Sequence, residues 1–148
     1  MQEISDLSFF QDKGNVLILT GCSKNKLNTE QEVPAEELYT GTLFRFVKEY
    51  ADSINADLYI ISAKYGLISR NTLIKTYDKV LRTYADAESL RPEIERELSL
   101  LHEGYDQILV IAGDKYRRTL MGIADERYYF LKTSGIGYTL HLLKEQIN

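Results

Sequence analysis

Four short runs of apolar residues are spaced along the chain, and the first three are almost uninterrupted. A continuous apolar run of this length is typical of a strand that is buried on both faces, as in a parallel sheet. Gly14 and Gly21 bound the first run and support this assignment. The predicted strands are Asn15–Thr20, Asp57–Ser62, Gln107–Ala112 and Arg127–Leu131.

Between these runs, apolar residues recur at the spacing of amphipathic helices. Pro34 stands where helices often begin, and Gly41 is a point at which the first helix can be interrupted. Pro92 fits the first turn of the next helix. The predicted helices are Ala35–Ile54, Leu90–Glu103 with Gly104 as its C-terminal cap, a helix capped by Asp114 that runs through Met121, and a last helix that follows Gly137 and ends near Gln146.

Three stretches lack either pattern. Cys22–Val33 is polar and is predicted to be a loop, Ala63–Ile68 to be a loop or a short strand, and Lys75–Leu81 is ambiguous. Strands that alternate with helices favour right-handed crossovers and a parallel sheet. With no repeat or linker, residues 1–148 are predicted to form a single α/β domain. Its expected architecture is three-layered and Rossmann-like, with a mainly parallel sheet and helices on both faces.

Parallel sheets bind their ligands at the carboxyl ends of the strands. Four stretches that follow predicted strands are the least explained by core packing, namely Cys22, Ser62–Gly66, Gly113–Tyr116 and Ser134–Gly137. We therefore expect Cys22, Lys64 and Gly113 to lie near one edge of the sheet.

The segment Cys22-Ser23-Lys24-Asn25-Lys26 is the strongest candidate site. Two neighbouring lysines favour a thiolate, which is the nucleophilic form of cysteine. Alternatively, Ser23, Lys24 and Lys26 together with free backbone N–H groups would hold a phosphate. A structural interpretation also exists, in which Cys22 is a small apolar plug at the strand end and the lysines are solvated.

A second cluster follows the second strand. Lys64 comes directly after a buried run, where it would be a base or an amine nucleophile, and Tyr65 would stack on a base or supply a hydroxyl. Ser62 and Gly66 flank them as binding positions. The structural alternative is a tight turn at Gly66 with Lys64 in water.

Other candidates are more isolated. Tyr77 is assigned to binding, while Asp78 is a candidate general base, although an Asp more often caps a turn. Glu37 is a candidate for acid–base work, although an acid at a helix start also stabilises the helix dipole. Gly113 and Tyr116 open a helix that would receive an anion. Gly135 and Gly137 resemble half of a dinucleotide fingerprint.

Composition narrows the class of protein. The formal net charge is −4 at pH 7, whereas proteins that coat duplex DNA are normally basic. A single cysteine fits a reducing, cytoplasmic setting, and no apolar run reaches the roughly 20 residues of a membrane helix. We therefore expect a cytoplasmic location and no membrane partner. His102 and His141 lack further ligands at metal-site spacing, so no metal is assigned, and no motif requires a cofactor.

Three pairs of segments carry a family resemblance: "LILTGCSKNK" with "PAEELYTGTLFR", "YIISAKYGLI" with "YDKVL", and "VIAGDKYRRTL" with "GIGYTLHLL". Together they resemble a family of small prokaryotic proteins of unknown function that is akin to the YaaA peroxide-stress proteins. The YaaA string "LSGLYGLLRP…PYR" matches Ser62, Tyr65, Gly66, Leu67 and Tyr77 here.

The first segment also resembles the "PCSxxKPYS" stretch of archaeosine synthase, at Cys22, Ser23 and either Lys24 or Lys26. The resemblance implies a pocket around Cys22 that binds or processes a nucleobase, a nucleotide or a modified nucleoside. The alternative that it implies is a non-catalytic DNA- or RNA-binding stress-response protein. Nucleic acid is a possible partner, but generic duplex is not expected. The sequence leaves the oligomeric state, and whether the protein is an enzyme, undecided.

Overall fold

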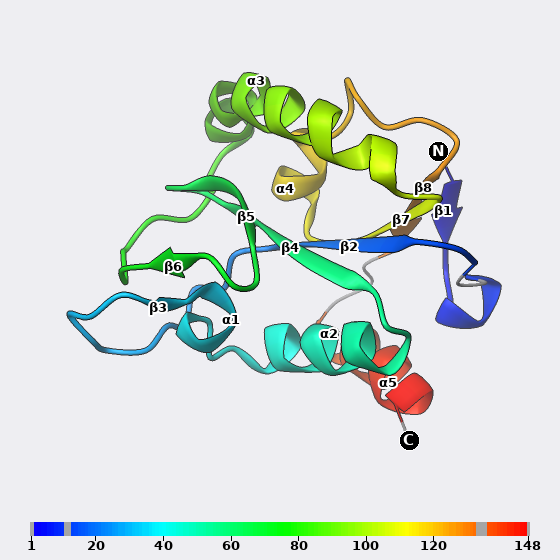
Figure 1. Ribbon diagram of the computed structural model, residues 1–148, viewed down its shortest axis with the longest axis horizontal. Coiled ribbons are helices and arrows are strands. Elements are labelled where there is room, and N and C mark those ends of the chain that lie inside the picture. The colour runs from blue at the N-terminus through cyan, green and yellow to red at the C-terminus, as the bar shows by residue number, and fades with distance from the viewer. Residues whose placement is uncertain (1, 11–12, 133–135, 148) are drawn as a thin grey trace.

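The computed structural model describes residues 2–10, 13–132 and 136–147. Its main element is a six-stranded sheet with the order β1-β8-β7-β2-β4-β5 (Figure 1). All neighbours pair in parallel except β5, which is antiparallel to β4. The strands of this sheet are β1 (Gln2–Ile4), β2 (Val16–Gly21), β4 (Asp57–Ser62), β5 (Gly66–Ser69), β7 (Gln107–Ile111) and β8 (Tyr128–Leu131).

Helices lie against this sheet from two sides (Figure 1). α3 and α4 lie on one side, and α2 and α5 pack against each other on the other side. The α-helices are α1 (Ala35–Leu38), α2 (Thr42–Ser53), α3 (Tyr84–Leu101), α4 (Asp114–Arg118) and α5 (Ile136–Ile147), and the 3₁₀ helices are η1 (Leu7–Phe9) and η2 (His102–Gly104). The predicted mixed α/β class with a mostly parallel sheet is confirmed, while the Rossmann-like description stays a prediction.

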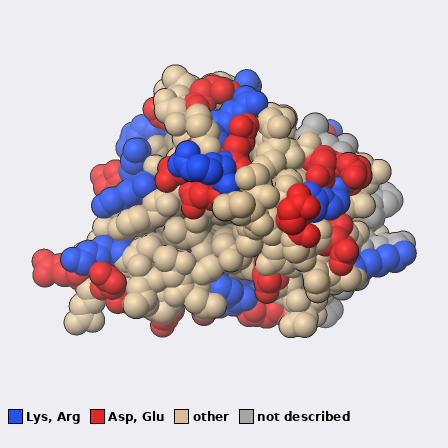
Figure 2. Space-filling view, turned by 45° about the horizontal axis from the view of Figure 1, so that its top comes forward, with Lys and Arg blue, Asp and Glu red and all other residues tan. Residues whose placement is uncertain are grey.

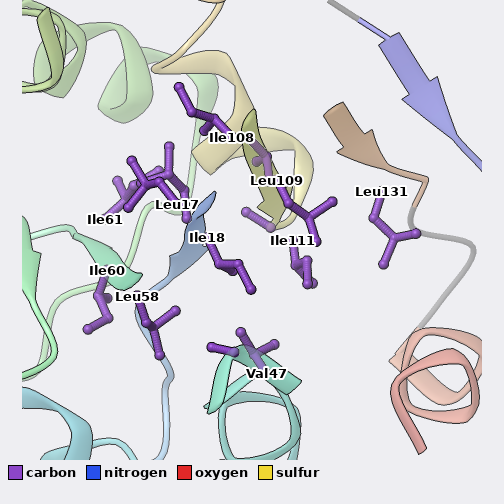
Figure 3. Close-up of a cluster of buried hydrophobic side chains, with 14 of the residues drawn as sticks. Leu17, Ile18, Val47, Leu58, Ile60, Ile61, Ile108, Leu109, Ile111 and Leu131 are labelled. Atoms are coloured by element: carbon purple, nitrogen blue, oxygen red, sulfur yellow. The ribbon is translucent and has the colours of Figure 1, made fainter. Parts of the chain in front are cut away.

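The hydrophobic core is centred on β2, β4 and β7 (Figure 3). Val16–Leu19 of β2 are all buried, although successive side chains of a strand point to opposite faces. Both faces of the sheet centre are therefore covered, which explains the continuous apolar runs. Val47 of α2 lies beneath Ile18 and Leu58 in the close-up.

The predicted interruption of the first long helix is confirmed. α1 ends at Leu38, and α2 begins at Thr42 with Gly41 as its N-cap residue. Gly41 has extended backbone angles, with φ −63° and ψ 148°, and no side chain caps the helix. The break turns the N-terminus of α2 toward the segment that follows β2.

α3 differs from the prediction at its start. It begins at Tyr84 rather than Leu90, so Pro92 lies inside the helix and not in its first turn. A capping box explains the earlier start: Thr83 accepts a hydrogen bond from the Asp86 N–H, and Asp86 accepts one from the Thr83 N–H. The helix ends at Leu101 with His102 as its C-cap residue, so Gly104 belongs to η2 and is not the cap.

α4 is shorter than predicted. Its N-cap is Gly113 rather than Asp114, and the α-helix stops at Arg118 before Met121. The Thr119 hydroxyl donates to the Tyr116 carbonyl at 2.6 Å and helps to end the helix. The short helix places Tyr116 close to the strand ends.

Three short strands were not predicted. β1 pairs with β8 at the sheet edge, and β3 (Val33–Pro34) pairs with β6 (Leu73–Ile74) in a separate two-stranded ladder. Strands of two or three residues are too short for a period-2 pattern to be visible. Among the described residues, no helix is long and apolar enough to cross a membrane.

Candidate functional site

The carboxyl ends of three neighbouring parallel strands define one edge of the sheet. β2 lies between β7 and β4, and all three run in the same direction. Cys22, Lys64 and Gly113 follow these strands within two residues, so the predicted shared edge is confirmed. The Cys22 N–H donates to the Ile61 carbonyl at 3.0 Å, which extends the β2–β4 pairing to the cysteine itself.

Cys22 contacts Tyr116 of α4. Its Sγ lies 3.1 Å from the Tyr116 hydroxyl oxygen, and the side chain is buried, with 8% of its surface exposed. Gly21 makes this approach possible, since a Cβ atom there would lie 2.9 Å from the Tyr116 ring. Gly21 and Cys22 at the end of β2 thus lie against the ring of Tyr116, which belongs to the connection between β7 and β8.

A chain of hydroxyl groups lies beside this pair. The Ser62 hydroxyl oxygen accepts from the backbone N–H groups of Lys64 and Tyr65, at 3.2 and 2.9 Å, which occupies both of its lone pairs. Its own hydrogen is therefore donated to Tyr77, 2.9 Å away. A second hydrogen bond, of 2.6 Å, joins the hydroxyl groups of Tyr77 and Tyr39.

The tyrosines of this cluster keep their hydrogens over the neutral pH range. Burial raises the pKa of Tyr39 to about 12, and the neighbouring Cys22 adds to the rise. Burial, followed by negative charge on Cys22, also raises the pKa values of Tyr77 and Tyr116. All three phenols are therefore hydrogen-bond donors at the pH of the cell.

Cys22 lies at the wall of a cavity of about 330 Å³. One side of the cavity is the segment after β2, and the other is the start of α2. The lining residues are Thr20, Gly21, Cys22, Ser23, Lys24, Asn25, Gly41, Thr42, Leu43 and Phe44.

The N-terminus of α2 makes the cavity suitable for an anion. The first N–H groups of a helix have no partner within the helix and carry partial positive charge. The first turn of α2, all of which is described, contains no acidic residue that would neutralise this charge. Lys24 is exposed on the facing wall. The Ser23 hydroxyl accepts from the Asn25 N–H at 3.2 Å and fixes the turn between them.

Lys26 and Tyr65 lie near the hydroxyl chain rather than on the cavity wall. The Lys26 ammonium sits 4.4 Å from the centre of the Tyr77 ring. The Tyr65 hydroxyl donates to the Lys75 carbonyl at 3.1 Å, and its ring meets that of Tyr77 edge to face.

Lys64 and Gly66 belong to the turn between β4 and β5. Lys64 is exposed and lines a separate cavity of about 240 Å³ that includes Glu93 of α3. Gly66 has a φ of 79°, a left-handed conformation that favours glycine. These positions agree with the predicted tight turn, and the structure does not bring Lys64 onto the wall of the Cys22 cavity.

The remaining predicted residues are scattered. Glu37 and Asp78 are exposed, and neither lines the Cys22 cavity. Gly113 is exposed at the start of α4, and Gly137 lies exposed in the first turn of α5. Gly135 lies outside the described residues.

A larger cavity, of about 560 Å³, lies at the opposite edge of the sheet. Its lining includes Asn15, Asp57 and Tyr105, which lie at or before the amino ends of strands. It contains none of the predicted site residues, and ligands of parallel sheets bind at the carboxyl ends. We therefore place the candidate site at the smaller cavity.

Several residues of the site were not predicted. Tyr39 ends the hydroxyl chain, and Gly41, Leu43 and Phe44 form the second wall of the cavity. The break at Gly41 was a usable signal, because a second helix start after a polar loop creates free N–H groups. The sequence around Tyr39 contains no pattern that would mark it as a site residue, apart from its aromatic side chain.

The buried tyrosines predict a loss of stability at high pH. A phenol whose folded-state pKa is raised contributes stability that is complete below its ordinary pKa of about 10 and is lost as the pH rises through the folded value. For Tyr39 the loss should extend from about pH 10 to about 12. Urea unfolding measured across this range, with phenolate absorbance followed in parallel, tests it. Titration of these phenols near pH 10 in the folded protein, as in the urea-unfolded chain, would contradict it.

Comparison with known proteins gives a family but no activity. A family model described as "Family of unknown function (DUF6884)" matches residues 17–145. The uncharacterized protein YfjM of Bacillus subtilis (strain 168) is 26% identical over 144 residues, which cover 88% of this chain and 94% of that protein. No solved structure matches the chain. These matches contain no link to YaaA or archaeosine synthase, so that finer resemblance stays a prediction. Because the family model spans most of its length, this chain belongs to the DUF6884 family of unknown function.

Proposed function

We propose that the cavity beside Cys22 binds a nucleotide or a phosphorylated modified nucleoside, and that Cys22 is the reactive group of the site. The observation that carries this proposal is the placement of the cavity: it lies at the carboxyl ends of parallel strands and combines a helix N-terminus, a lysine and the only cysteine. Its volume of about 330 Å³ falls at the lower end of the range for small-molecule sites, about 300–1,000 Å³.

The two walls suit different parts of such a ligand. The free N–H groups of Thr42 and Leu43 and the ammonium of Lys24 would hold the phosphate. Leu43 is half-buried, and its apolar surface is available to a base, while Phe44 lines the same wall but is almost fully buried. The mixture of charge at the rim and apolar surface inside favours a nucleotide over a free phosphate.

The tyrosine hydroxyls support a chemical role for Cys22. Tyr116 contacts Sγ directly, while Tyr39 and Tyr77 stand close enough for charge on the sulfur to raise their pKa values. A hydroxyl that donates to a sulfur atom, as Tyr116 does to a Cys22 thiolate, favours the thiolate, the form that attacks an electrophilic carbon. The resemblance to archaeosine synthase at Cys22 and Ser23 is consistent with a purine-like base.

The charge distribution offers less support for the nucleic-acid alternative. Blue and red atoms are interspersed over the face seen in Figure 2, rather than forming one continuous basic surface. With a net charge of −4, few phosphates can be neutralised, and duplex binding depends on the number of neutralised phosphates. We therefore expect weak binding to generic duplex DNA at physiological salt.

Calorimetric titration with GMP, guanosine and inorganic phosphate tests the proposal. GMP should bind more tightly than guanosine or inorganic phosphate, because only GMP contacts both walls of the cavity. Lys24→Glu should weaken GMP binding by about tenfold or more, since it replaces an attraction by a repulsion worth more than about 1.4 kcal/mol. Lys144→Glu on α5 is the matched control and should have little effect. Absence of GMP binding, or an equal loss in the control, would contradict the proposal.

A further inference from the structure

Tyr116 is held in a fixed position between two segments. Its ring lies against Gly21, where an added Cβ would approach ring atoms to 2.9 Å, and its helix follows β7 directly. The backbone N–H of Leu81 also donates to the Tyr116 hydroxyl oxygen, at 3.4 Å. The hydroxyl is thus positioned by the backbone of β2 and of the segment before α3.

The hydrogen bond between Tyr116 and Cys22 has only one possible direction when the cysteine is a thiolate. Because the Tyr116 oxygen accepts from an N–H group, its single hydrogen is available for the sulfur 3.1 Å away. Burial raises the pKa of Tyr116, so the hydroxyl retains that hydrogen at neutral pH. A Cys22 thiolate carries no hydrogen, so in that form the sulfur is the acceptor.

From this geometry we propose that Tyr116 is the positioning residue of Cys22: its hydroxyl donates to Sγ, holds the sulfur at the cavity wall and stabilises the thiolate. The inference rests on the proposed function, in which Cys22 is the reactive group. Tyr116 itself acts through Cys22 and does not line the cavity.

Tyr116→Phe tests the inference, because it removes the hydroxyl and keeps the ring. The readout is the rate of alkylation by iodoacetamide as a function of pH, which reports on Cys22 alone because the chain has one cysteine. We expect the pH midpoint of the rate to rise by about one unit, so that the rate at neutral pH falls by up to about tenfold. A change in access alone would alter the plateau rate at high pH and leave the midpoint unchanged.

Tyr105→Phe is the matched control. It also removes a hydroxyl, which donates to Asp57 at the opposite edge of the sheet, and should leave the midpoint unchanged. Gly21→Ala is a second variant that displaces the Tyr116 ring while keeping its hydroxyl, and it should raise the midpoint as Tyr116→Phe does.

An unchanged midpoint in both Tyr116→Phe and Gly21→Ala, or an equal shift in Tyr105→Phe, overturns the positioning role. If GMP still binds the wild-type protein in that case, the proposed function survives and only the inference fails. If GMP does not bind the wild-type protein, the proposed function fails independently of these variants.

Discussion

Replacing Leu109 with alanine is expected to lower the free energy of unfolding by about 2–5 kcal/mol. Leu109 is fully buried in β7, at the centre of the sheet (Figure 3). Its truncation removes apolar contacts and leaves a cavity that the surrounding strands can fill only in part. Urea unfolding followed by circular dichroism measures the change.

Leu100→Ala is the matched control, since it makes the same chemical change at a side chain that is 82% exposed on α3. Surface substitutions of this kind change stability by within about 0.5 kcal/mol. Equal effects of the two variants would show that β7 is not the buried centre of the protein.

Gly41→Val is expected to weaken GMP binding by tenfold or more while the protein remains folded. A Cβ at Gly41 would lie 2.4 Å from the Ser23 hydroxyl oxygen, so the larger valine side chain would push into the cavity between the two walls. It would also displace the segment that carries Cys22. Calorimetry gives the affinity, and the melting curve reports the fold.

Gly113→Ala provides the control at a neighbouring strand end. A Cβ there meets no atom within 4 Å, so the substitution should leave both the affinity and the fold unchanged. Unchanged GMP binding by Gly41→Val would place the ligand outside the cavity beside Cys22.

The centre of the fold was predictable because its sequence pattern has one physical cause. Val16–Leu19 and Ile108–Ile111 are apolar without interruption, since both faces of the sheet are covered. β1 was missed because its pairing with β8 is a tertiary contact that Gln2 and Glu3 do not indicate. The start of α3 was missed because Pro92 is typical of a first turn, whereas the capping box at Thr83 starts the helix at Tyr84.

The site was predictable only in part, for a related reason. The strand-end rule located Cys22, Ser62 and Tyr116, because the ends of parallel strands meet at one edge of a sheet. Tyr39 and the start of α2 reach the site through the loop after Cys22, whose path depends on long-range contacts such as the bridge between Lys26 and Tyr39. A local pattern does not encode such a path.

The most direct measurement of the central claim is the alkylation rate of Cys22 at about pH 7, with and without saturating GMP. If the cavity binds the nucleotide beside the sulfur, GMP should slow the reaction severalfold, and guanosine at the same concentration should protect less. The urea-unfolded chain gives the rate of the freely accessible thiol as the reference. An alkylation rate that GMP does not change at millimolar concentration would contradict the proposal that this cavity is the functional site.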